Sequence, residues 1–505
     1  MTPRRTVPKF LTIGLLAAAF VAAGCATAPR LPVHLEHHTQ DANTWVFDVN
    51  RDKRPDFWHF GGPDGRKIAI AYAAEGDDGP GPRIELDAFD AGDCPHLLIA
   101  LDGVPFEIVD ELYRAGHFRF FYPPARVINC FPGMTDLALS ELFHVGPCRA
   151  YQALYYDRAT RRVSSGSGDY LSAANSPWVA HMDYRCSFWW DALVYLNPQA
   201  VFNHELKGIR RAFRQIDSGW GCAYSVGTAG LGTRQGRSGI EEYLRTIERL
   251  CDQIIYERRG RVKLTLVADH GHNLAENRRV SFRPLLAECG YRPARSLRSP
   301  QDVVTISYGL VTCADFHTDD PAGVAECLLR HEDVELACYP TDGAVVVRDR
   351  AGLARILPGQ HGYRYEPASG DPLQLAEIIA TLRAAGHINA AGEIHPAALF
   401  TATLDHYYPD PLDRIWTAFH GLVEHPADVI VSLRDGACHG SRFFYTMVGT
   451  MSSTHGGLNR INSTTFVLTM LGELPPALRT REVLPALEAL GAPQRASAAQ
   501  QHAAR

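Results

Sequence analysis

The stretch over residues 263–273, with the sequence KLTLVADHGHN, constrains the fold more than any other. Its first half is a short apolar run with a threonine and a valine, which is typical of a buried strand in a parallel sheet. The run stops at Asp269, and His270 and His272 follow directly. Because ligands of open α/β sheets bind just beyond the carboxyl ends of strands, this position predicts either a divalent metal site or merely a polar turn.

The composition is that of an ordinary globular protein. The chain has 505 residues, of which 46% are hydrophobic and 21% charged. This length allows several domains or one large α/β core with insertions. The 50 basic and 56 acidic residues give a net charge of −6, a balance that indicates no nucleic-acid partner.

The N-terminus has the pattern of an export signal. A basic cluster precedes an apolar run over residues 10–23, which is too short to span a membrane comfortably. The run ends in AAGC, which resembles a bacterial lipobox with Cys25 as the lipidated first residue of the mature protein. A plain secretory signal with a chance cysteine is the alternative. We therefore predict a lipoprotein signal peptide over 1–24 and a lipid anchor on the periplasmic face of a membrane, the outer membrane first, or at the cell surface.

The other cysteines are scattered along the sequence, with no CxxC pair and no zinc-ribbon spacing. An exported protein permits disulfides, but the pairing does not follow from the sequence. An odd number of cysteines remains after Cys25, so at least one is unpaired. Cys222, Cys251 and Cys327 lie in apolar runs and are expected to be buried thiols.

Residues 25–92 are predicted to form a tether and an N-terminal segment that contains one acidic loop. In the sequence DVNRDKRPD, oxygen-bearing side chains occupy relative positions 1, 3, 5 and 9: Asp48, Asn50, Asp52 and Asp56. The spacing resembles the calcium loops of dockerin and FG-GAP-type repeats, and calcium requires six to eight oxygens around one point. Lys53 stands where those loops usually have glycine. The loop therefore binds calcium or is a solvated acidic turn.

Strands alternate with helices along the chain, which indicates a sheet with helices on both faces. Apolar runs predict strands over residues 97–101, 151–156, 223–226, 264–268 and 429–433. Helical spacing predicts helices over residues 107–115, 240–258, 282–289 and 372–385. We expect a core over 93–291 and 401–475, an insertion or cap over 292–400 with a small sheet of its own, and a disordered tail over 476–505.

Four segments at strand ends carry side chains suited to a metal site. They are the strand end at Asp102, the loop 131–138 with Thr135, the pair Asp269 and His270, and the segment 453–459 with His455. In this order and spacing they resemble the alkaline phosphatase superfamily, particularly its nucleotide pyrophosphatase/phosphodiesterase branch, over residues 95–285 and 425–470. The resemblance implies an alkaline-phosphatase-like fold, a doubly wound mixed α/β sheet with helices on both faces and an inserted cap-like region.

The resemblance also implies the roles of these side chains. Thr135 falls at the position of the family's nucleophile, just before a helix whose N-terminal N–H groups suit a phosphoryl oxygen. A threonine hydroxyl is a poor nucleophile unless it is activated, for example by a metal. One divalent transition metal ion, with zinc expected, would be held by Asp102, Asp269 and His270, with Thr135 as fourth ligand. The alternative is that Thr135 is simply a helix N-cap.

The sequence departs from the two-metal members of that family in one turn. Those members have an aspartate and a histidine four residues apart, and Ala229 and Thr233 stand at these positions within residues 224–236. Methyl and hydroxyl side chains do not replace a carboxylate and an imidazole as strong ligands. Of the second metal site only His455 remains, so the clamp that neutralises both attacking and leaving oxygens is incomplete.

Three interpretations remain open. In the first, the chain is a single-metal, phosphodiesterase-like hydrolase or phosphoryl-group transferase whose site resembles that of phosphoethanolamine and phosphoglycerol transferases. His455 and Arg234 would then bind the phosphate of a small phosphoester or a lipid headgroup. In the second, another histidine completes a second metal site, with these candidates: His272, His361 and His439. In the third, the chain is a catalytically impaired pseudoenzyme that keeps the fold to bind a ligand or a partner.

Overall fold

The computed structural model describes residues 27–39, 41–74, 79–90, 92–164, 176–191 and 193–493. The predicted signal peptide over 1–24 and the lipidation residue Cys25 lie outside these residues. Within the described part of the chain, no helix is both long enough and apolar enough to cross a membrane.

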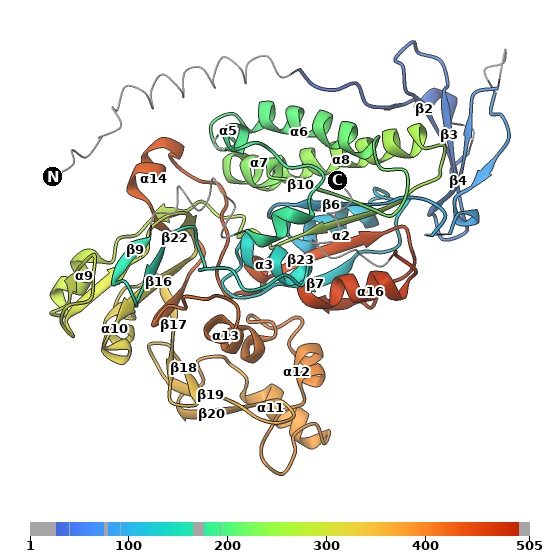
Figure 1. The fold of residues 1–505 in the computed structure, drawn as a ribbon. Helices are drawn as coiled ribbons and strands as arrows, with labels where there is room; N and C mark the ends of the chain where they lie inside the picture. Colours follow the sequence, from blue (N-terminus) through green and yellow to red (C-terminus); the bar gives the residue numbers. More distant parts are fainter. Residues whose placement is uncertain are drawn as a thin grey trace, which may run out of the picture.

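A six-stranded mixed sheet forms the centre of the protein (Figure 1). Its strands, in spatial order, are β10 (Trp220–Ser225), β6 (His96–Leu101), β11 (Lys263–Ala268), β23 (Thr464–Thr469), β7 (Ala125–Ile128) and β24 (Ala477–Arg479). Strand β6 is parallel to both β10 and β11, whereas β23 is antiparallel to β11 and β7. The parallel strands β10, β6 and β11 therefore end at the same edge of the sheet.

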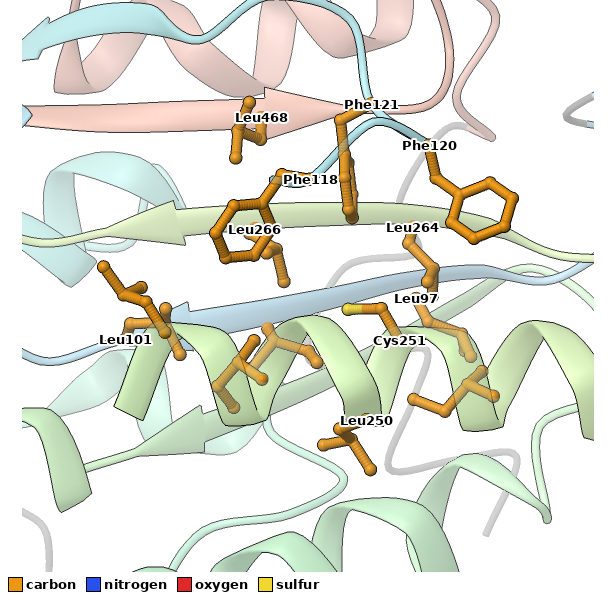
Figure 2. Packing of buried hydrophobic residues seen from close by; sticks show 14 of the residues in the cluster. Leu97, Leu101, Phe118, Phe120, Phe121, Leu250, Cys251, Leu264, Leu266 and Leu468 are labelled. Atoms are coloured by element: carbon orange, nitrogen blue, oxygen red, sulfur yellow. The ribbon is translucent and has the colours of Figure 1, made fainter. Parts of the chain in front are cut away.

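Helices cover both faces of this sheet because alternate side chains of a strand point to opposite faces. On one face, Leu97 and Leu264 pack in a cluster with Leu250 of α8 and with Phe121, as Figure 2 shows. On the other face, Leu98 packs in a cluster with residues of α3 and α16. The helices of this part are α2 (Phe106–Arg114), α3 (Thr135–Leu142), α6 (Pro198–Phe213), α7 (Gly227–Gln235), α8 (Arg237–Glu257) and α16 (Val483–Ala489). The predicted α/β fold class is confirmed.

A second sheet of eight strands is built mostly from the predicted insertion. Its spatial order is β13 (Arg292–Pro293), β14 (Asp302–Thr305), β16 (Cys313–Thr318), β21 (Val429–Leu433), β17 (Val334–Thr341), β18 (Ala344–Arg348), β19 (Leu353–Pro358) and β20 (Tyr363–Ser369). Apart from the β13–β14 pair, neighbouring strands are antiparallel.

Helices also cover both faces of the second sheet. One face packs against α9 (Arg283–Glu288) and α10 (Pro321–Leu328), which a disulfide between Cys289 and Cys327 joins. The other face packs against α11 (Ala376–Ala384), α12 (Pro396–Ala402) and α13 (Pro411–Phe419). Cys327 is therefore not the thiol that its apolar surroundings predicted, whereas Cys222 and Cys251 are buried cysteines outside any disulfide among the described residues.

Smaller elements complete the fold. Within residues 25–92, β1 (Val33–His34), β2 (Thr44–Asp48), β3 (Phe57–Gly61), β4 (Lys67–Tyr72) and β5 (Ile84–Glu85) form an antiparallel sheet. This sheet rests on α8, where the Tyr72 hydroxyl donates to the Tyr256 carbonyl at 2.8 Å. A three-stranded sheet contains β12 (Arg278–Arg279), β22 (Ala437–Gly440) and β15 (Leu310–Val311). Helices α5 (Phe188–Asp191), α14 (Arg442–Val448) and α15 (Arg460–Ser463) are short.

Of the predicted core strands, one does not form in the core and one forms but belongs to the second sheet. Residues 151–156 form no core strand; β8 (Tyr155–Asp157) pairs only with β9 (Arg162–Ser164) in a small hairpin. Strand β21 is real but lies in the second sheet, between β16 and β17. The core strand next to the His455 segment is β23 instead, which the sequence did not predict. An apolar run indicates that a strand is buried, but it does not indicate which strand pairs with it.

The chain after residue 475 also differs from the predicted disordered tail. Strand β24 pairs with β7, and helix α16 follows it. Leu478, Val483 and Leu487 are buried in the cluster beneath the six-stranded sheet. Their spacing gives the segment an apolar side that is stabilised by burial despite its many alanines. Residues 494–505 lie outside the described part of the chain.

Candidate metal centre and pocket

A cavity of about 630 Å³ opens at the carboxyl ends of the parallel strands. Asp102 lines it from the end of β6, Thr135 from the start of α3 and Tyr224 from β10. Helix α7 contributes a second wall, and β15 and α14 contribute a third. The cavity thus lies where ligands bind in open α/β sheets.

Asp102 and Asp269 are neighbours because β6 and β11 run parallel in register. Leu101 pairs with Ala268 at the last position of both strands, so the two aspartates are the first residues beyond the sheet. The backbone N–H groups of Gly103 and His270 donate to Asp269 Oδ1 at 2.9 and 2.8 Å. The Tyr224 hydroxyl donates to Asp102 Oδ2 at 2.6 Å. One oxygen of each carboxylate is fixed in this way.

The second oxygen of each carboxylate points at His270. Asp102 Oδ1 and Asp269 Oδ2 each lie 3.4 Å from His270 Nε2, and both are buried without a hydrogen-bond partner among the described residues. His270 Nδ1 donates to the Gly271 carbonyl at 3.0 Å, which leaves the lone pair of the neutral ring on Nε2. Two carboxylate oxygens and a ring lone pair therefore converge on one point. This arrangement is unfavourable alone and fits a divalent cation.

Thr135 completes this group. It is the first residue of α3, and its Oγ1 lies 3.3 Å from His270 Nε2. The N-cap position belongs to Met134, and no side chain caps this helix end. The alternative that Thr135 is merely the N-cap is therefore wrong. The structure brings together the four predicted ligands Asp102, Thr135, Asp269 and His270.

His455 and His272 extend the site on the side of the cavity. The His455 ring stacks on His270 with ring centroids 3.8 Å apart, and its Nδ1 donates to the Gly133 carbonyl at 2.8 Å. His272 lies beside both rings and contacts Ser453 Oγ through Nδ1 at 2.8 Å. Of the three spare histidines that the sequence offered, only His272 reaches the site. His361 is exposed in a turn of the second sheet, and His439 contacts Ser307 and Val280.

Burial sets the protonation of these groups. It lowers the pKa of His270 to about 4 and that of His455 to about 3, so both rings are neutral at pH 7. It raises the pKa of Asp269 to about 6, and burial together with Asp269 raises the pKa of Asp102 well above its usual range. Neutral imidazole is the form that binds metal, and a bound cation favours the charged carboxylates.

Ala229 and Thr233, which stand where the second pair of ligands was expected, both line the cavity from α7. Their neighbour Arg234 does not. It is exposed and donates to the Val448 carbonyl, because each further residue turns about 100° around a helix. Arg234 therefore lies outside the cavity in which it was predicted to contact a phosphate. Among the described residues, the groups of His, Cys, Asp and Glu that suit a metal are Asp102–Asp269–His270 and His270–His272–His455.

Aromatic side chains make up much of the remaining cavity wall. They come from several distant segments: Tyr151, Trp178, Tyr195, Tyr224, Tyr308, Phe443 and Phe444. Among the described residues, Arg185 is the one basic side chain that lines the cavity. Residues so far apart in sequence share no common pattern, so the sequence did not reveal this wall.

The predicted calcium loop lies between β2 and β3, away from the cavity. Asp48 accepts from the Arg51 and Lys53 N–H groups, and Asp56 accepts from Val49 N–H at 2.7 Å. Asn50 and Asp52 likewise accept one backbone N–H each from within the loop. The side-chain oxygens that were predicted to bind calcium thus accept hydrogen bonds from backbone N–H groups of the same loop. Calcium binding there stays a prediction.

Comparisons with known proteins give a distant structural likeness. No family model and no curated protein matches the sequence. Among solved structures, murine ectonucleotide pyrophosphatase/phosphodiesterase 5 is 12% identical with a TM-score of 0.44, covering 79% of this chain and 97% of that one. Human ectonucleotide pyrophosphatase/phosphodiesterase 5 is 10% identical with a TM-score of 0.45, covering 79% and 96%. At this identity and TM-score the likeness identifies no shared activity.

Proposed function

We propose that the protein is a metal-dependent phosphoester hydrolase or phosphoryl-group transferase, phosphodiesterase-like, with Thr135 as nucleophile. One observation carries the proposal. Thr135 Oγ1 and two otherwise unpaired carboxylate oxygens surround the same ring nitrogen of His270 at 3.3–3.4 Å. This donor set suits one divalent transition metal ion, with zinc first. When bound, the ion supplies positive charge that favours ionisation of a hydroxyl and stabilises a phosphoryl oxygen.

The other parts of the site position the substrate. Helix α3 begins at Thr135, so the partial positive charge of its N-terminus lies where a phosphoryl oxygen would approach. His455 adds a neutral ring with Nδ1 fixed on the Gly133 carbonyl, which leaves Nε2 to accept a hydrogen bond. Asp136 accepts from Ser176 Oγ and Trp178 Nε1, which ties the start of α3 to the cavity wall.

The cavity indicates the kind of substrate. Its aromatic wall suits an organic group of a small phosphoester or a lipid headgroup. With Arg185 as its one basic side chain among the described residues, it offers little compensation to a highly charged polyphosphate. We therefore propose a phosphoester with few negative charges as the substrate.

A binding-only role is the second candidate, and one observation favours it. Ala229 and Thr233 face the cavity from α7 at the positions where a second set of metal ligands was expected. A site with only one ion lacks the partner that would stabilise the leaving oxygen. Such a pseudoenzyme would still bind a phosphoester in the cavity without cleaving it.

The two candidates differ in one measurement. The purified full chain should be analysed for metal and assayed on generic phosphate monoesters and diesters beside Thr135→Ala. Thr305→Ala is the matched control, because its hydroxyl lies in the second sheet and has no hydrogen-bond partner in the described part of the chain. The enzyme proposal expects about one ion per chain and activity that only Thr135→Ala abolishes. No cleavage above background by either the wild type or Thr135→Ala would leave the binding-only role, and equal measurable rates in both would contradict Thr135 as nucleophile.

We also propose that the chain is exported and anchored by a lipid at Cys25. The signal-like sequence over 1–25 supports this, and the Cys289–Cys327 disulfide suits an oxidising compartment. Membrane fractionation of cells that express the full chain tests it. The wild type should fractionate with membranes and Cys25→Ser should not; co-fractionation of both would contradict the anchor.

A further inference from the structure

The two aspartates of the metal centre are oriented by different kinds of group. Asp269 Oδ1 accepts two backbone N–H groups, those of Gly103 and His270, at 2.9 and 2.8 Å. The carboxylate of Asp102 accepts from a single donor among the described residues, the Tyr224 hydroxyl, which lies 2.6 Å from Oδ2. The orientation of Asp102 therefore depends on one side chain, which a substitution can change without altering the backbone.

Strand pairing places Tyr224 beside Asp102. Tyr224 in β10 pairs with Ala100 in β6, and Asp102 follows two residues after Ala100. The pairing extends to the end of the strand, because the Asp102 N–H donates to the Ser225 carbonyl at 3.1 Å. Residues two apart on a strand point to the same face. The Tyr224 side chain thus leaves the sheet on the same face as Asp102 and reaches its Oδ2 atom.

The Tyr224 ring is itself held in place. It packs edge to face on Trp178, with ring centroids 4.9 Å apart and planes at 64°, an arrangement that aromatic pairs favour. Trp178 is buried, and its Nε1 donates to Asp136 Oδ1 at 2.9 Å. Asp136 follows Thr135 at the start of α3. The tyrosine hydroxyl is therefore fixed relative to Asp102 and also to the start of this helix.

The hydrogen bond decides which oxygen of Asp102 faces the metal site. Because Oδ2 accepts from the hydroxyl, Oδ1 is the oxygen directed at His270 Nε2, 3.4 Å away, and it has no hydrogen-bond partner in the described part of the chain. The last torsion of an aspartate side chain is broad, so without the hydroxyl the carboxylate would adopt several orientations. Losing a group that orients a metal ligand typically weakens metal binding about 10–100-fold.

We propose that Tyr224 is a positioning residue of the metal centre, whose hydroxyl orients Asp102 so that Oδ1 faces the metal site. The inference rests on the metal site of the proposed function, but it does not depend on catalysis. Tyr224 belongs to the segment 224–236, in which Ala229 and Thr233 stand at the positions of the second pair of ligands. A segment that supplies no strong ligand of its own thus contributes to metal binding by orienting a ligand that follows β6.

Zinc titration of the full chain, stripped with a chelator, tests the proposal. Tyr224→Phe keeps the ring and removes the hydroxyl, and it should weaken Zn²⁺ binding about 10–100-fold in calorimetry. Tyr365→Phe is the matched control: its hydroxyl donates to an Asp371 carboxylate oxygen at 2.8 Å in the second sheet, and this variant should bind Zn²⁺ as the wild type does. The Co²⁺ absorption spectrum, which reports the ligand set, should change in Tyr224→Phe and stay unchanged in Tyr365→Phe.

A double variant separates positioning from a merely structural effect. In Asp102→Asn the charged oxygen is absent, so the addition of Tyr224→Phe should weaken Zn²⁺ binding no further. A second loss of about tenfold in that background would overturn the proposal, and so would wild-type Zn²⁺ affinity in folded Tyr224→Phe. If Tyr224→Phe does not fold, Trp178→Leu takes its place. It removes the ring that holds Tyr224 and should also weaken Zn²⁺ binding, and unchanged affinity would overturn the proposal.

These titrations distinguish this inference from the proposed catalytic function. A wild type that binds zinc but cleaves no phosphoester would contradict catalysis, whereas weaker binding by Tyr224→Phe would still support the positioning role. Equal zinc affinity in the wild type and in Tyr224→Phe would overturn the positioning role alone. A wild type that binds no divalent metal would overturn both.

Discussion

The six-stranded and eight-stranded sheets are both built from buried strands, yet their buried aspartates differ in their hydrogen bonding. Asp269 follows the end of β11, and burial raises its pKa to about 6. Asp315 lies inside β16, and burial also raises its pKa to about 6. Asp315 Oδ1 accepts a hydrogen bond from Gln152 at 2.9 Å, whereas Asp269 Oδ2 has no hydrogen-bond partner among the residues that the structure describes.

The difference comes from strand direction rather than from burial. Strands β6, β10 and β11 are parallel, so their carboxyl ends and the loops that follow meet at one edge. The neighbours of β16 are antiparallel, so their carboxyl ends alternate between the two edges of the sheet. Polar side chains therefore gather into a site at one edge of the first sheet and stay dispersed in the second.

The strongest test of this comparison replaces the two aspartates separately. Asp269→Asn should weaken divalent metal binding by more than about 100-fold, beyond the loss expected for outer-shell partners, because it removes the charged ligand. Asp315→Asn should leave metal affinity unchanged. Calorimetric titration of both folded variants measures this. Equal metal affinities in the two would show that the unpaired oxygen of Asp269 has no part in metal binding.

A gain of function sharpens the comparison within the first sheet. Ala229→Asp combined with Thr233→His adds a carboxylate and an imidazole on the wall of α7 that faces the cavity. The double variant should bind one more Zn²⁺ ion per chain than the wild type, because His455 then has two partners. Metal analysis after gel filtration gives the count. The single variants, each one ligand short, serve as controls, and an unchanged count in the double variant would show that α7 lies too far from His455.

A smaller, pH-dependent effect is expected in the second sheet. Burial raises the pKa of Glu335 in β17 to about 7, although the Tyr407 hydroxyl donates to it at 2.8 Å. Because the folded protein favours the protonated carboxyl, the contribution of Glu335 to the stability of the fold is fully present below about pH 4.5. It is lost as the pH rises through about 7. The unfolding free energy of the wild type should thus fall across this range by about 1–3 kcal/mol relative to Glu335→Gln, and its Tm should fall accordingly. Glu366→Gln, an exposed carboxylate of the same sheet, should follow the wild type, and parallel profiles for all three would contradict the buried-carboxyl explanation.

The smallest expected effect concerns Arg234. Because its side chain leaves the cavity and contacts the Val448 carbonyl, Arg234→Ala should leave KM for phosphoesters unchanged and shift the unfolding free energy by about 0.5 kcal/mol or less. Steady-state kinetics and thermal denaturation measure both. A marked rise in KM would mean that the arginine turns into the cavity when substrate binds.

Much of the site could be predicted because its residues follow strand ends that are visible in the sequence. Asp102 and Asp269 each come directly after an apolar run, and the structure places them side by side. Thr135 and His455 were found from the loops that carry them. His272 was only one of three equal candidates, since nothing in the sequence shows which histidine faces His270.

Strand pairing was the part that the sequence left open. The run in β21 has the same apolar character as those in β6 and β11, yet it pairs with β16 and β17. The core position beside β11 belongs to β23, whose threonines make it look less like a buried strand. Residues of β24 and α16 likewise looked like a tail because each segment is short, and they become stable only by packing on β7 and its neighbours.

The sequence by itself determined the local features: buried strands that end in Asp102 and in Asp269-His270, and the absence of strong ligands at Ala229 and Thr233. These follow from side-chain chemistry and from periodicity over a few residues. Only the tertiary structure decided that His272 joins His270 and His455 while Arg234 turns away. Such choices depend on ring orientation and on contacts between segments nearly 200 residues apart, such as His272 with Ser453. No local pattern records them, because the partners meet only when the sheet has formed.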